Sequence, residues 1–157
     1  MKKEMYGEQF REHLLEQYKL YVEMADRVSD RRERTNRFYI SLLLLLLALL
    51  SVVITKDVLE KLQKFAFMAV AMLGLVLCAL WELNIRSYRK LNSGKFTIIH
   101  EMEQHLPYKC YDREWKILND GQGIKYLQLT RIEQWIPIVV AVLYALLFIY
   151  SWMLCVQ

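Results

Sequence analysis

The segment from His100 to His105, which reads HEMEQH, carries the residue types most often used in metal and acid–base chemistry. A zinc-binding HExxH helix places its two His residues four positions apart, so that both rings reach one metal ion. Here the interval is five positions, and at about 100° per residue the two rings point about 140° apart on a helix. We therefore expect a solvated face of an amphipathic helix here, with no metal held between the two His side chains.

The other candidates for chemistry lack the spacing that their chemistry requires. Gly121, Gly123 and Lys125 are too few and too differently ordered for a phosphate-binding loop. The cysteines form no CxxC pair and no disulfide framework, so we interpret them as small apolar fillers: Cys78, Cys110 and Cys155. No nucleophile, base and orienting group stand together in the sequence. We expect a protein that is not an enzyme and needs no cofactor.

The apolar residues of this chain are concentrated in three blocks. Of 157 residues, 55% are hydrophobic and 24% are charged, and the charges are almost absent from these blocks. Each block approaches the roughly 20 residues that cross a ~30 Å hydrocarbon layer as a helix. The sequence thus predicts an all-α integral membrane protein with transmembrane helices at residues 38–55, 65–83 and 135–156. A long amphipathic helix at residues 1–37 precedes them, and a cytoplasmic helix extends the second span within residues 84–134.

Basic residues near the ends of the spans predict the orientation, because loops rich in Lys and Arg stay in the cytoplasm. Five Arg precede the first span and four basic residues follow the second: Arg27, Arg31, Arg32, Arg34 and Arg37, then Arg86, Arg89, Lys90 and Lys95. Residues 1–37 and 84–134 should therefore be cytoplasmic, and the link at 56–64 and the C-terminus should be external. We expect Arg31, Arg32, Arg34 and Arg37 to contact anionic lipid, and nucleic acid is not an expected partner.

Two sets of residues have the spacing of helix-packing surfaces. In the N-terminal helix, apolar residues recur at alternating steps of four and three: Leu14, Tyr18, Tyr21, Ala25 and Val28. This seam packs either on the same chain or on another subunit. In the second span, Ala71, Gly74 and Cys78 form a strip of small residues on which another helix backbone could approach closely.

A cluster of aromatic, amide and ionisable residues follows the second span: Trp81, Glu82, Asn84, Arg86, Tyr88, Arg89 and Lys95. Such groups need partners where a helix leaves the bilayer. Glu82 and Arg86, at i and i+4, have the spacing of an ion pair on one helix. We interpret the cluster, together with Tyr111, Trp115 and Pro137, as membrane-interface and cytoplasmic contact residues, either within the subunit or between subunits.

The same region carries a resemblance to a known family. The runs WELNIRSYRKLNSGKF (81–96), IIHEMEQHLP (98–107), YDREWK (111–116) and LTRIEQWIP (129–137) resemble those of the RipA-type family of bacterial octameric inner-membrane proteins. The resemblance implies a homo-octamer of helical subunits in the bacterial inner membrane, without catalytic residues.

What such an assembly does is left open by the sequence. The resemblance implies a role in phage defence through a membrane pore, or in adaptation to stress. The spans show no continuous polar stripe, so a closed or lipid-filled ring is as well supported as a water-filled channel. An alternative is a membrane-tethered adaptor, whose cytoplasmic helices bind a soluble protein partner or trigger.

Overall fold

The computed structural model describes residues 7–55, 60–119 and 129–156, and most of these residues lie in four helices. Helix α1 runs from Phe10 to Thr55 and α2 from Glu60 to Glu103. The short helix α3 spans Cys110–Asn119, and α4 spans Leu129–Val156. The external link expected at 56–64 lies partly, and the segment with Gly121, Gly123 and Lys125 wholly, outside the described residues.

Helices α1, α2 and α4 are each long and apolar enough to cross a membrane, as the sequence predicts. Helix α1 contains no Gly or Pro over its 46 residues, so the N-terminal amphipathic helix continues into the first apolar run without a break. Helix α2 likewise continues beyond its apolar run. Helix α4 includes Pro137 in its interior.

Helix α2 ends at Glu103, four residues before Pro107. The amides of Gln104, His105 and Leu106 each donate to a carbonyl three residues earlier, which is the tighter 3₁₀ pattern of a terminal helical turn. Residues before a proline avoid the α conformation because the ring clashes with their backbone. The α-helix is therefore lost before Pro107 is reached.

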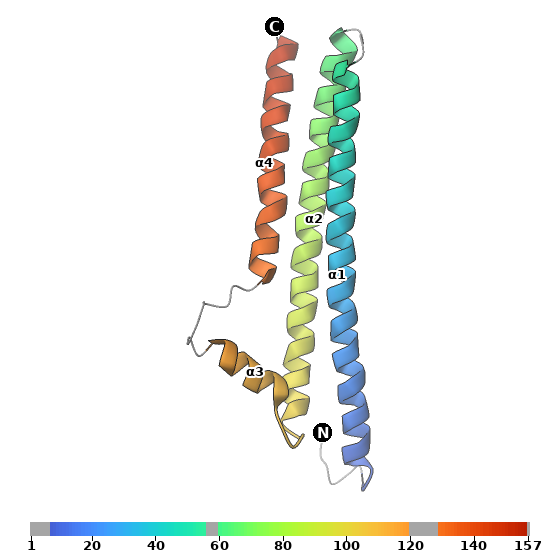
Figure 1. Ribbon diagram of the computed structural model, residues 1–157, viewed down its shortest axis with the longest axis vertical. Helices are drawn as coiled ribbons and strands as arrows, with labels where there is room; N and C mark the ends of the chain where they lie inside the picture. The colour runs from blue at the N-terminus through green and yellow to red at the C-terminus, as the bar shows by residue number, and fades with distance from the viewer. Residues whose placement is uncertain (1–6, 56–59, 120–128, 157) are drawn as a thin grey trace. The chain divides into compact units, whose positions relative to one another are not determined.

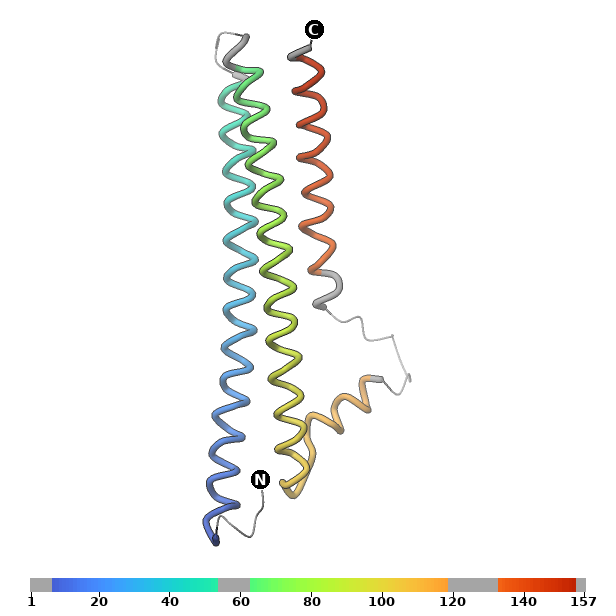
Figure 2. The backbone as a smooth tube through the Cα atoms, turned by 180° about the vertical axis from the view of Figure 1, so that it is seen from behind, coloured from blue at the N-terminus to red at the C-terminus, as the bar shows by residue number. Residues whose placement is uncertain are grey.

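The chain divides into two compact units. Unit 1 comprises Met1–Arg31 and Tyr88–Leu127, and unit 2 comprises Arg32–Ser87 and Gln128–Gln157. Within unit 2, the second half of α1, the first half of α2 and the whole of α4 run side by side (Figure 1). Within unit 1, the start of α1 and the end of α2 pack together, and α3 diverges from α2 (Figure 2).

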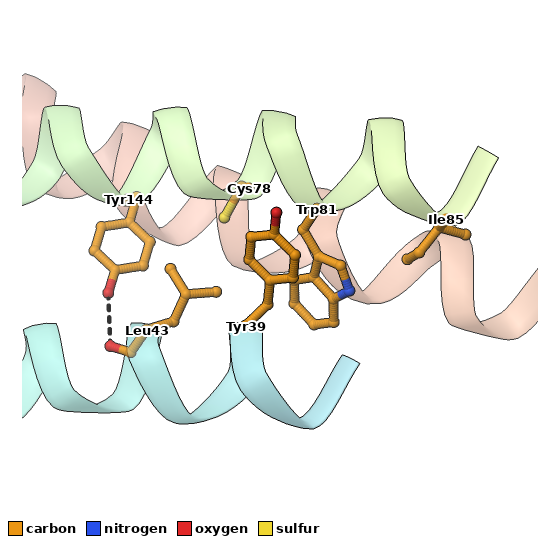
Figure 3. Packing of buried hydrophobic residues seen from close by; sticks show 6 residues of the cluster. All are labelled: Tyr39, Leu43, Cys78, Trp81, Ile85 and Tyr144. Carbon is orange, nitrogen blue, oxygen red and sulfur yellow. Dashed lines mark hydrogen bonds between the residues drawn. The ribbon is translucent and has the colours of Figure 1, made fainter. Parts of the chain in front are cut away.

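A small core lies among the three helices of unit 2. Figure 3 shows its six buried residues: Tyr39, Leu43, Cys78, Trp81, Ile85 and Tyr144. Outside this core, large apolar side chains on the same helices are widely exposed, among them Leu44, Met72, Val76, Val142 and Leu146. Such surfaces are stable when lipid or other subunits cover them.

Candidate functional site

The predicted seam of α1 lies along the buried side of that helix in unit 1. Leu14, Ala25 and Val28 are buried, and Tyr18 and Tyr21 are half-buried. Tyr18 and Tyr21 both contact side chains of α2 in the same chain, as described next. The seam therefore has partners within the protomer.

Glu103, the last residue of α2, is a buried carboxylate that holds the start of α3. Its Oε1 accepts hydrogen bonds from the Tyr18 hydroxyl (3.1 Å) and the Tyr111 amide (2.9 Å), and its Oε2 accepts one from the Asp112 amide (3.3 Å). The first amides of a helix have no partner inside the helix, and a negative charge there also interacts favourably with the helix dipole. One side chain thus joins α1, α2 and α3.

This position corrects the expectation of a solvated face at HEMEQH. Glu103 is fully buried, whereas Glu101 and His105 are exposed. His100 lies beside it, with 3.5 Å between its Nδ1 and Glu103 Oε2. Among the described residues, no group of three or more His, Cys, Asp or Glu side chains is arranged to hold a metal ion.

The surroundings of Glu103 favour neutral tyrosines. Burial raises the pKa of Tyr18, and the hydrogen bond that its hydroxyl donates to Glu103 raises it further. Burial also raises the pKa of Tyr111, with a contribution from the charge of Glu114. On the exposed side of α3, the hydrogen bond from Lys116 lowers the pKa of Asp112.

Two further contacts join the helices of unit 1. The ammonium group of Lys95, a buried residue, lies 4.8 Å from the centroid of the Tyr21 ring, which is a cation–π geometry. Phe96 and Tyr111 meet edge to face with ring centroids 5.5 Å apart. Trp115, four residues further along α3, is 47% exposed.

The small-residue strip of α2 lies in unit 2 and packs against α4 of the same chain. Ala71, Gly74 and Cys78 are all buried. A Cβ atom added at Gly74 would lie 2.6 Å from Cγ of Tyr144 and still closer to two other ring carbons. The ring occupies the space that glycine leaves, and its hydroxyl donates to the Leu43 carbonyl on α1 at 3.0 Å (Figure 3).

Four side chains form a polar and aromatic contact between α1 and α2 in unit 2. The Trp81 indole donates to Asn36 Oδ1 at 2.9 Å, and its ring stacks on Tyr39 with centroids 5.9 Å apart. The Asn84 amide donates to the Tyr39 hydroxyl at 2.7 Å. Trp81 is 1% exposed, so its ring faces the chain's own interior.

Several charged residues near this contact in unit 2 form ion pairs. Glu82 and Arg86 form the i,i+4 ion pair that their spacing indicates, at 2.7 Å. Arg32 is only 17% exposed and lies 3.4 Å from Glu133 of α4, which connects α1 to α4. Of the other predicted lipid-contacting arginines, Arg31 and Arg34 are exposed and Arg37 pairs with Glu33.

The remaining predicted site residues divide between buried and exposed positions. Pro137 is fully buried, Tyr88 is half-buried and Arg89 is exposed. Cys78 is a buried filler as expected, but Cys110, the first residue of α3, is exposed. For Cys110 the filler interpretation is therefore wrong.

Sequence reasoning missed several residues that hold the helices together: Asn36, Tyr39, Glu103, Glu133 and Tyr144. Asn36 and Tyr39 look like ordinary residues of a long helix, and nothing local indicates their partners 45 residues away. Glu103 had a usable signal. An acid just before a helix break is well placed to cap the next helix.

Comparison with known proteins gives one match. The model of a family described as the octameric membrane protein family matches residues 15–153, most of the chain. No match was found among curated proteins or among solved structures. The matched range includes the first two apolar runs, most of the third, the Trp81–Asn36 contact and the Glu103 cap.

Proposed function

The chain belongs to the octameric membrane protein family, and from this membership we propose that it is a non-enzymatic homo-octamer of the bacterial inner membrane. In this proposal unit 2 forms the membrane part of a ring, and unit 1 lies in the cytoplasm. The observation that carries the proposal is the broad apolar surface of the spans in a chain whose family is octameric.

The surface of unit 2 supports assembly within a membrane. On α4, large apolar residues are exposed along one broad face of the helix, including Val139, Val142, Leu143, Leu146 and Ile149. A helix that is apolar on most sides is stable only in lipid or inside a larger assembly. An octamer provides both environments, because each subunit contacts two neighbours and the bilayer.

The polar groups of the described helices support a structural role over a catalytic one. Glu103, the most deeply buried acid among the hydrogen-bonded residues described above, caps α3. The Tyr144 and Ser151 hydroxyls donate to backbone carbonyls of their own chain. Such bonds between helices and within them hold the fold together.

The hydrogen bond of the Tyr144 hydroxyl also bears on whether the ring conducts ions. A water-filled channel needs polar or charged groups facing its lumen, or a hydrophobic constriction that wets when it opens. Since the Tyr144 hydroxyl faces α1 of its own chain, we propose a ring that is closed or lipid-filled at rest. A pore acting in phage defence, which the family resemblance implies, would then require a trigger that rearranges the spans.

Native mass spectrometry of the full chain, released from mild detergent or nanodiscs, tests the assembly. We expect an octamer, and a monomer at every detergent concentration tried would overturn the proposal. Dye-loaded liposomes test the resting state. Retention of the dye is expected, and leakage from liposomes holding the protein alone would refute a closed ring while leaving the octamer intact.

Alkaline phosphatase fused after Gln157 tests the orientation. Phosphatase activity is expected, because alkaline phosphatase folds only outside the cytoplasm. The arginine-rich segments stay in the cytoplasm, which places the C-terminus on the external side. A fusion inserted after Gly94, an exposed residue of unit 1, is the matched control and should be inactive. The reverse pattern would overturn the orientation.

A further inference from the structure

Among the exposed apolar residues of unit 1, two groups lie on α3 and on α1. On α3, Trp115 is 47% exposed and Leu118 is 37% exposed. On α1, Leu20 is 57% exposed and Met24 is 41% exposed. We call Tyr111, Trp115 and Leu118 the α3 face, and Leu20 with Met24 the α1 strip.

The α3 face is the apolar side of an amphipathic helix, and only part of it packs against α2. Its three residues stand at i, i+4 and i+7, so they lie on one side of the helix. Tyr111 packs on Phe96 near the start of α3, and Trp115 and Leu118 come later in the helix. Helix α3 diverges from α2 (Figure 2). Beside Tyr111, the α1 residues Val22 and Asp26 help to line a groove of about 340 Å³.

The two surfaces lie on different sides of unit 1. At about 100° per residue, Leu20 and Met24 project from α1 roughly 160° away from Val22 and Asp26, the groove residues beside α3. The α1 strip therefore faces away from the α3 face of its own chain. Head-to-tail rings require two different contact surfaces on opposite sides of each subunit, and the α3 face and the α1 strip have this arrangement.

Lipid is poorly placed to cover the α3 face. Helix α2 continues without a break from Leu83, where its apolar run ends, to Glu103, which is about 30 Å of helix. The start of α3 is fixed at Glu103 by the two amide hydrogen bonds. In the orientation proposed above unit 1 is cytoplasmic, so protein and water, and not lipid, are the partners available to the exposed Trp115 ring.

We propose that the α3 face of each copy receives the α1 strip of the next copy, so that unit 1 forms a closed ring of identical contacts. The proposal rests on the homo-octamer proposed above. A second copy is the occupant because the family is octameric and because each chain carries both halves of the contact. Flexible apolar side chains such as Met24 suit an open, aromatic-lined surface.

Disulfide cross-linking of the full chain in membranes tests the contact. The background is a chain with Cys110→Ser and Cys155→Ser, and Cys78 is kept because it is buried. Leu20→Cys together with Trp115→Cys should give a ladder of cross-linked species up to the octamer. Each single variant should give little dimer, since the two positions meet only each other.

Leu91→Cys with Trp115→Cys is the matched control, because Leu91 is an equally exposed apolar residue of unit 1, on α2. Cross-linking of this pair in place of the first would overturn the assignment of the α1 strip. Strong dimers from Leu20→Cys alone would show a symmetric contact and also overturn it. An octamer by mass spectrometry without any ladder refutes this contact only, whereas a monomer refutes the proposed assembly itself.

Discussion

Replacing Glu103 with Gln tests whether one buried carboxylate positions α3. The variant keeps the size of the side chain and one acceptor oxygen but loses the charge. In the wild type, the carboxylate accepts bonds from the Tyr18 hydroxyl and from the Tyr111 and Asp112 amides. A hydrogen bond to a charged group contributes about 1.5–3 kcal/mol, so removing the charge from three bonds should cost at least about 2 kcal/mol locally.

Hydrogen exchange followed by mass spectrometry measures this cost directly, because local opening determines the exchange of α3 amides. A loss of about 2 kcal/mol corresponds to roughly 30-fold faster exchange. The effect should be confined to α3, the adjacent end of α2 and the part of α1 around Tyr18. The amides of α4, in unit 2, should exchange as in the wild type.

Glu101→Gln is the matched control, since Glu101 lies on the same helix but is exposed. It removes the same charge and should leave α3 unchanged. Equal exchange of α3 in Glu103→Gln, Glu101→Gln and the wild type would refute the capping argument. Faster exchange in both variants would show that net charge matters and the cap does not.

Two further outcomes follow from the contacts. Gly74→Ala should lower the free energy of unfolding in detergent by about 1–3 kcal/mol, because the added Cβ overlaps the Tyr144 ring. Gly94→Ala should be neutral or slightly stabilising, because nothing lies within 4 Å of the added atom. Equal effects of the two substitutions would refute the close packing. The pKa of Tyr18 is raised above its ordinary value of 10.0, so its contribution is complete below that pH and is lost as the pH rises beyond it. Above pH 10, the stability measured by thermal unfolding with circular dichroism should therefore fall less steeply with pH in Tyr18→Phe than in the wild type. Parallel curves of stability against pH would contradict this.

Gly74 shows that a sequence pattern can indicate close helix packing without identifying the partner helix. The strip of Ala71, Gly74 and Cys78 indicates close helix packing, and the close packing is present. Its partner, however, is Tyr144 of the same chain. A bulky residue at Gly74 would therefore disturb the protomer, and loss of the octamer in such a variant would not report on contacts between subunits.

The sequence by itself determined the number and length of the membrane-spanning helices of this protein and the contacts within single helices. Runs of apolar residues and the scarcity of Gly and Pro predict three membrane-spanning helices and the continuation of α2 beyond its span. The seam from Leu14 to Val28 and the Glu82–Arg86 pair were also readable, because both depend on spacing along a single helix. Periodicity within one helix is a local property, so one segment contains all the information.

Only the tertiary structure decided which side chains meet across helices. Tyr18 reaches Glu103 across 85 positions, and Tyr144 reaches the Leu43 carbonyl across 101. These pairings depend on how each helix is rotated and shifted against its neighbour, and several registers bury an apolar face equally well. Specific hydrogen bonds and the fit of an aromatic ring onto a glycine select one register, and those contacts exist only once the helices are packed.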